Sequence, residues 1–189
     1  MNKIRSFVAI PLPEDIRRSI RRLLNKLRQD DDGIAWVPVD NLHLTLKFLG
    51  DVHDTEVPAV CQAIHEACDG LAPFPLTISG IGALPSWEKA RVLHAGVSDP
   101  DSVLIRLVAD LETRLAELGY KREPRDYVPH LTLGRAKGVS RRASLEVLER
   151  LKQFEKFHAG EVVVDQIQLV ASFLDKSGPT YQTMATVQL

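Results

Sequence analysis

The chain has 189 residues, of which 44% are apolar and 26% are charged, values typical of an ordinary globular protein. These values exclude collagen-like, coiled-coil and wholly disordered chains. With 24 Lys plus Arg and 25 Asp plus Glu, the net charge is -1, far from that of a protein that coats long nucleic acid by charge alone. A nucleic-acid partner is therefore expected to be held locally, at one group or one end.

The first part of the chain predicts a strand, a helix and two further strands. Residues 4–10 form a short apolar run that reads as a buried strand. Pro13 then opens a helix, which ends at the run of acids before Gly33. Short strands are expected at residues 34–37 and 42–49. The helix is expected to bury a single apolar stripe at helical spacing, formed by Ile16, Ile20, Leu23, Leu24 and Leu27.

The rest of the chain continues to alternate between helices and strands. Helices are expected at residues 54–70, 99–119 and 140–154, and strands at residues 74–81, 91–97, 127–135, 161–171 and 181–189. This order is neither a strict βαβ alternation nor an all-β series, so it predicts an α+β fold with largely antiparallel sheets. No linker or low-complexity segment divides residues 1–189, which we expect to form a single domain.

Targeting and membrane signals are not expected from this sequence. The N-terminal apolar run meets Pro11 and Pro13 at once, which is unlike a signal peptide. No uncharged run reaches the roughly 18 residues that a membrane helix needs. The two cysteines, Cys61 and Cys68, cannot make a disulfide scaffold and are expected to be small apolar fillers. We therefore expect a cytoplasmic protein with no membrane contact.

One tetrapeptide, His-Leu-Thr-Leu, occurs twice, at residues 43–46 and again at residues 130–133. Both copies fall in predicted strands, and a predicted helix follows each. The repetition predicts an internal duplication with one copy in each of two lobes, related by an approximate two-fold axis.

Successive side chains of a strand point to opposite faces. In the first copy, His43 and Thr45 therefore share one face with Lys47, and the other face carries the apolar set Leu44, Leu46 and Phe48. In the second copy, His130 and Thr132 share one face and the leucines the other. If the leucines meet helix-packed cores, the lobes can bring two imidazoles and two hydroxyls together in a central cleft.

Such a set of groups suits displacement at phosphorus. An imidazole titrates near neutral pH, so one neutral and one protonated ring form a base and an acid. Hydroxyl groups can bind phosphate oxygens. Because the attacking and leaving oxygens are roughly in line, two histidines on opposite lobes can flank one phosphorus. This chemistry requires no metal and no cofactor.

Other active-site types are less well supported by the sequence. His-x-Thr is neither a His-x-His nor a His-Glu-x-x-His metal motif. There is no Gly-x-Ser-x-Gly elbow and no phosphate-binding Gly-x-x-x-x-Gly-Lys-Ser/Thr loop. The other histidines are scattered and are expected to be structural or at the surface: His53, His65, His94 and His158.

With these two motifs and their flanks, the chain resembles the 2H phosphoesterase superfamily, and within it the RNA 2',3'-cyclic phosphodiesterases, also called 2'-5' RNA ligases. The resemblance covers most of the chain. It is carried by the segments 5–10, 13–14, 36–38, 41–50, 91–93 and 129–135 and by the tail around Tyr181.

The resemblance implies a bilobed fold and a role for each matching residue. His43 would be the proton donor to the departing 3' oxygen, and His130 the proton acceptor that activates water. Thr45 and Thr132 would bind the phosphate. Arg135 matches a further phosphate contact of the family, although simple parity puts it on the leucine face unless twist or a bulge turns it into the cleft. The implied partner is RNA with a 2',3'-cyclic phosphate end, for example a tRNA half, bound by a monomer.

Three points stay open at this level. Lys47 is a second candidate for a charge near the phosphate. Phe7 and Tyr181 are expected to pack in the core, the alternatives being that they stack on a base or line the cleft. The alternative to an enzyme is a non-catalytic protein of the same fold that binds a nucleotide or an RNA end.

Overall fold

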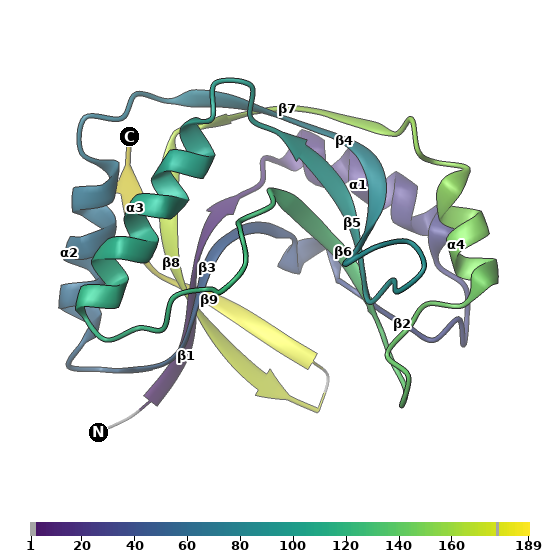
Figure 1. Ribbon diagram of the computed structural model, residues 1–189, viewed down its shortest axis with the longest axis horizontal. Coiled ribbons are helices and arrows are strands. Elements are labelled where there is room, and N and C mark those ends of the chain that lie inside the picture. Colours follow the sequence, from purple (N-terminus) through teal and green to yellow (C-terminus); the bar gives the residue numbers. More distant parts are fainter. Residues whose placement is uncertain (1–2, 177) are drawn as a thin grey trace.

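The computed structural model describes residues 3–176 and 178–189 (Figure 1). Within these residues, strands and helices build two antiparallel sheets. The first sheet has the order β3-β1-β8-β9, with bounds β1 (Lys3–Pro11), β3 (His43–His53), β8 (Gln166–Asp175) and β9 (Gly178–Gln188). The second has the order β2-β6-β5-β4-β7, with bounds β2 (Ile34–Trp36), β4 (Phe74–Leu84), β5 (Val92–Ser98), β6 (His130–Ala136) and β7 (His158–Val164).

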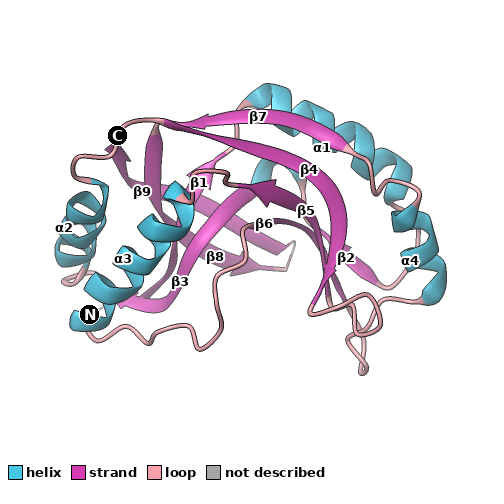
Figure 2. Ribbon diagram, turned by 45° about the horizontal axis from the view of Figure 1, so that its top comes forward, coloured by secondary structure: helices cyan, strands magenta, loops and turns pink. Residues whose placement is uncertain are grey.

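Each sheet is covered by two helices (Figure 2). Helices α2 (Val57–Cys68) and α3 (Val103–Glu117) pack together on the first sheet, where they contact β9 and β3. Helices α1 (Glu14–Leu27) and α4 (Leu145–Lys152) cover the second sheet, where they contact β7 and β4. The predicted bilobed α+β fold with outer helices is confirmed.

Two of the helices cover the sheet to which their preceding strand does not belong. Helix α1 follows β1 of the first sheet but packs on the second, and α3 follows β5 of the second sheet but packs on the first. The chain therefore has to cross back before β3 and again before β6, the two strands that begin with the motif histidines. The crossings tie the two lobes together through the chain itself.

The helices form where apolar residues recur at helical spacing. The stripe predicted for α1, from Ile16 to Leu27, is buried. Glu14 and Asp15 lie in the first turn, where carboxylates interact favourably with the helix dipole. A similar stripe on α3 is buried against the first sheet: Leu104, Leu107, Val108, Leu111 and Leu115. None of the helices in the described residues is long and apolar enough to span a bilayer.

The prediction of one strand over residues 161–171 is wrong, because this stretch belongs to two strands in different sheets. Strand β7 pairs with β4, whereas β8 pairs with β1 and β9. The buried residues change parity at the junction, from Val162 and Val164 to Ile167 and Leu169. The exposed Asp165 is the residue at which the chain passes from the second sheet to the first.

Both motif strands contain the same irregularity. In β3, Thr45 pairs with Ala9 while Lys47 pairs with Val8, so Leu46 is one extra residue. In β6, Thr132 and Gly134 pair with two consecutive residues of β5, so Leu133 is extra in the same way. An extra residue of this kind is a β-bulge, and it reverses the faces of the side chains that follow it, in β3 as far as a second register shift after Phe48.

Candidate active site

The two motif histidines are anchored identically. Nδ1 of His43 lies 2.7 Å from the carbonyl oxygen of Asn41, and Nδ1 of His130 lies 2.7 Å from the carbonyl oxygen of Val128. Because a carbonyl oxygen only accepts, Nδ1 of each ring is the donor. Nε2 of each ring is then the atom that can take up or release a proton. The two copies of the tetrapeptide thus share the same hydrogen bond between the imidazole and the backbone.

Up to the bulge, each motif has the predicted faces. The four motif leucines are buried in the main core, while the histidines and threonines are only partly buried: Leu44, Leu46, Leu131 and Leu133 against His43, Thr45, His130 and Thr132. In each lobe an imidazole and a hydroxyl therefore lie side by side on the face opposite the leucine core.

Beyond the bulge, the predicted faces of the first motif are wrong. Phe48 was expected with the leucines but is 60% exposed, and Lys47 was expected beside His43 but is only 4% exposed. The extra residue Leu46 turns Lys47 inward and Phe48 outward. Phe48 therefore joins the side of His43, where its ring centroid lies 6.0 Å from that of Phe7.

Lys47, a candidate for a charge near the phosphate, instead has an internal role. Its Nζ lies 2.8 Å from Oε2 of Glu112 on α3 and 2.9 Å from the carbonyl oxygen of Lys121. The ion pair is shielded from solvent, since the Glu112 side chain is only 16% exposed. Lys47 thus fastens α3 and the segment after it to β3.

The equivalent bulge turns Arg135 toward the histidines. Arg135 is exposed, and its guanidinium is close enough to lower the pKa of His43 and to oppose the rise in the pKa of Tyr181. Arg135 belongs to β6 of the second sheet, whereas His43 and Tyr181 belong to the first. Arg135 thus approaches the first sheet from the second, and we call the motif residues together with this arginine the inter-lobe site: His43, Thr45, His130, Thr132 and Arg135.

Aromatic rings surround His43. Phe7, 3% exposed, stacks on the imidazole with a centroid distance of 4.5 Å, and Tyr181 meets it edge-on at 5.1 Å. Phe7 also belongs to a small apolar cluster with Ala9 and Val170 that is separate from the main core. Phe7 and Tyr181 thus pack against each other and also lie against the imidazole of His43.

This environment lowers the pKa of His43. Burial is the largest cause, because it disfavours the charged ring. The hydrogen bond to Asn41 acts in the opposite direction, and the charges of Arg135 and Arg17 lower the pKa further. In the free protein, His43 therefore loses its proton more readily than an exposed histidine does.

His94 was expected to be structural or at the surface, and the structure places it beside His130. The two rings meet edge-on with centroids 5.5 Å apart. The ring lies over Gly82, where a Cβ atom would come within 2.8 Å of it. Burial lowers the pKa of His94, and the charge of His130 acts in the same direction. The alternation of buried Leu93 and Ala95 around it was the signal that His94 faces away from the core.

The residues that could bind a metal ion are dispersed. Within residues 3–176 and 178–189, no three His, Cys, Asp or Glu side chains gather in an arrangement able to hold one.

The family model described as LigT like Phosphoesterase matches residues 10–94 and again residues 96–181, so each match contains one copy of the tetrapeptide. The RNA 2',3'-cyclic phosphodiesterase of Methanothermobacter thermautotrophicus is 33% identical over 187 residues, which cover 99% of this chain and all of the relative. The enzyme of the same name from Thermotoga maritima is 30% identical and covers 98% of this chain and 95% of its own.

The fold is similar to that of a solved relative. The crystal structure of Escherichia coli LigT complexed with 3'-AMP superposes with a TM-score of 0.81 at 28% identity, over 100% of this chain and 99% of that one.

The internal ion pair generates a prediction about stability. The substitution Lys47→Met leaves the Glu112 carboxylate partly buried without its counter-charge, and removing one partner of such a pair costs about 3–5 kcal/mol. We expect the free energy of unfolding, measured with urea, to fall by about this amount. The double variant Lys47→Met/Glu112→Leu removes both charges and should recover part of the loss. A single variant as stable as the wild type would contradict this role for Lys47.

Proposed function

The chain belongs to the LigT-like phosphoesterase family, and we propose that it hydrolyses RNA 2',3'-cyclic phosphate ends to 2'-phosphomonoesters through its two motif histidines. The observation that carries the proposal is the matched pair of imidazoles, each with Nδ1 bound to a carbonyl oxygen and Nε2 left for proton transfer. The two relatives described above are named for this activity, and this chain matches them over nearly their whole length.

In the proposed reaction, His130 accepts a proton from water as the water oxygen attacks phosphorus. The bond between phosphorus and the 3' oxygen breaks, and His43 donates a proton to that oxygen, leaving a 3' hydroxyl and a 2'-phosphate. The proton then returns from His130 to His43 through solvent. A ribose hydroxyl in place of water gives a 2'-5' bond by the same steps, so the proposal extends to reversible ligation of RNA halves, tRNA halves included.

The charges at the inter-lobe site support these roles. Thr45 and Thr132 are proposed to donate hydrogen bonds to phosphate oxygens, and Arg135 to offset their negative charge. A bound phosphate in turn opposes the charges of Arg135 and Arg17, which lower the pKa of His43 in the free protein. His43 is therefore expected to take up its proton as the substrate binds.

We propose that residues 1–189 act as one domain and as a monomer in the cytoplasm, and that the reaction needs no metal and no cofactor.

An oligonucleotide that ends in a 2',3'-cyclic phosphate tests the reaction directly. In the presence of EDTA, we expect conversion to the 2'-phosphate at an undiminished rate, because neither the attacking water nor the leaving oxygen is assigned to a metal ion. Chromatography that resolves 2'- from 3'-phosphate products reports the bond that breaks. Activity that EDTA abolishes and a divalent ion restores would refute the mechanism.

The two histidines are expected to be individually essential. His43→Ala and His130→Ala should each lower turnover about 100-fold or more, the range for losing an acid or a base. His53→Ala is the matched control: His53 lies at the opposite end of β3 from His43, and its buried Nδ1 has no hydrogen-bond partner among the described residues. Turnover by the His43→Ala variant close to that of the control would eliminate the assignment.

The pKa of His43 provides a further prediction. The substitution Arg135→Gln removes a positive charge that lowers this pKa, so the pKa of His43 should rise, which an NMR titration of the free protein measures. The limb of the pH profile of kcat/KM that belongs to His43 should move to higher pH, although the rate itself falls with the loss of a phosphate contact.

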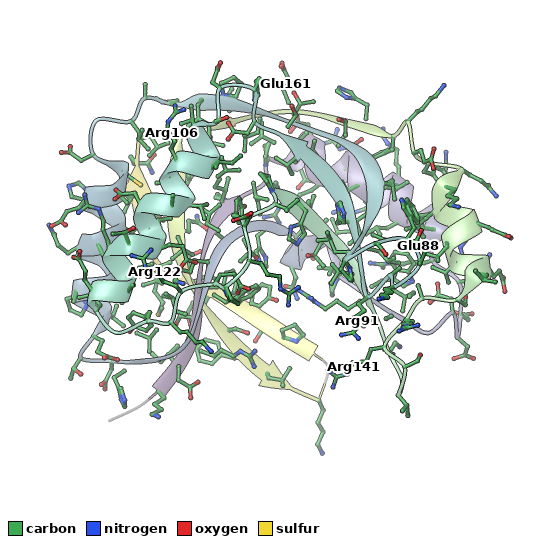
Figure 3. All side chains as sticks on the ribbon, in the orientation of Figure 1. Glu88, Arg91, Arg106, Arg122, Arg141 and Glu161 are labelled. Atoms are coloured by element: carbon green, nitrogen blue, oxygen red, sulfur yellow. The ribbon has the colours of Figure 1, made fainter. Side chains whose placement is uncertain are left out.

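Arg106→Gln is the control for this titration. Arg106 is an exposed arginine on α3 and is not among the charges that act on His43 (Figure 3). An unchanged or lowered pKa of His43 in the Arg135→Gln protein would show that the guanidinium does not lie at this ring in solution.

A further inference from the structure

The chain reaches each motif histidine through a connector that has just crossed between the lobes. Residues 28–42 lead from α1 on the second sheet to β3 of the first. Residues 118–129 lead from α3 on the first sheet to β6 of the second, as Figure 1 shows. Each connector ends with the carbonyl group that holds the imidazole, Asn41 before His43 and Val128 before His130.

Each connector is also bound to the strand of the other motif. The first carries β2, which pairs with β6, and the backbone N–H of Val37 extends this ladder by donating to the carbonyl oxygen of Leu133 at 2.9 Å. The second is fully described and contains no helix or strand. Its bonds to β3 come from side chains: Lys47 to the carbonyl oxygen of Lys121, and the Tyr127 hydroxyl to the carbonyl oxygen of Thr45 at 3.0 Å.

The bond from Tyr127 links the two motifs over a very short path. The hydroxyl of Tyr127 donates to the carbonyl oxygen of Thr45 in the first motif. The next residue is Val128, whose carbonyl oxygen accepts from Nδ1 of His130. The first motif is thus connected to the imidazole of His130 by two hydrogen bonds and the backbone between Tyr127 and Val128.

We propose that Tyr127 is a positioning residue, which holds His130 at the correct place relative to the first motif by donating its hydroxyl to Thr45. The inference rests on the proposed function, in which both imidazoles act on one phosphorus. Tyr127 is assigned no contact with substrate and acts through Val128 and His130.

The hydroxyl is suited to this role over the whole working pH range. Burial raises the pKa of Tyr127 well above its usual range, with a smaller contribution from the charge of Asp99. The phenol therefore keeps its proton and remains a donor. A carbonyl oxygen offers no proton in return, so the direction of the bond is fixed.

Turnover should depend on this bond more strongly than substrate binding does. In-line displacement requires the base, the water and the phosphorus to be aligned, and small displacements of a reacting group have large effects on rate. In Tyr127→Phe the ring remains and the connector loses its bond to Thr45, while its bond from Lys47 to Lys121 is kept. The groups proposed to bind phosphate, Thr45, Thr132 and Arg135, are unchanged.

Two matched variants test the proposal. Tyr127→Phe and Tyr120→Phe each remove one hydroxyl from the same connector, but the Tyr120 hydroxyl donates to Glu56, away from both motifs, at 3.5 Å. We expect both variants to fold and to melt within a few degrees of the wild type. With a cyclic phosphate oligonucleotide, kcat should fall about ten-fold or more in Tyr127→Phe with KM changed less than about three-fold. In Tyr120→Phe both constants should stay within about two-fold of the wild type.

A measurement without turnover separates this inference from the proposed function. In ¹⁵N-histidine spectra, Tyr127→Phe should shift the Nδ1–H signal of His130 while that of His43, which is held by Asn41, stays in place. If the wild type does not open cyclic phosphates, the proposed function fails, and the spectra still report whether Tyr127 positions His130. A variant with wild-type kcat, or with an unshifted His130 signal, would overturn the inference and leave Tyr127 a purely structural residue.

Discussion

The inter-lobe site depends on one departure from regular strand geometry, the bulge that follows each His-x-Thr. In a regular strand the fifth residue after the histidine would lie on the opposite face, but the extra residues Leu46 and Leu133 reverse this. Phe48 and Arg135 thereby join the side of the imidazoles, and the residues before them turn inward. The residue that turns inward after the bulge is Lys47 in the first motif strand and Gly134 in the second. Gly134 is required where it stands, because a Cβ atom there would come within 2.7 Å of Ile34 and 3.0 Å of Trp36 on the adjacent β2.

The repeat gives the two histidines the same backbone anchor and different surroundings. His43 lies against Phe7 and Tyr181, and burial and two arginines lower its pKa. His130 has another imidazole, that of His94, at its edge. Because the pKa of His43 is lowered in the free protein, its proposed role as donor to the leaving oxygen requires the bound phosphate, whose negative charge raises this pKa and favours the protonated ring. The lobes are thus similar where a histidine must be held and different where the proposed roles diverge.

Much of the architecture could be predicted from the sequence, and the exceptions share a physical cause. The stripe of α1 and the buried motif leucines follow from periodicity within one segment. The positions of Lys47 and Phe48 do not, because a bulge is defined only by the register with a partner strand. The division between β7 and β8 was missed because both halves are apolar and alternating, and their membership of different sheets is decided by distant strands. His94 was discounted as a single histidine, since its neighbour on β6 becomes visible only when β5 and β6 are paired.

The crossing of the helices ties the two lobes together and so helps to fix the relative positions of the two motifs. Helices α1 and α3 each follow a strand of one sheet and cover the other, and the buried residues of both lobes form one continuous cluster. Because each covers the other sheet, separation would pull a buried stripe out of a core. The two connectors then differ in what holds them: strand pairing with β6 for the one before His43, and the side chains of Lys47 and Tyr127 for the one before His130. Backbone hydrogen bonds between strands are retained in most substitutions, whereas a single substitution can remove a side-chain hydrogen bond. The connector before His130 is therefore the one whose attachment to the other lobe a single substitution can weaken.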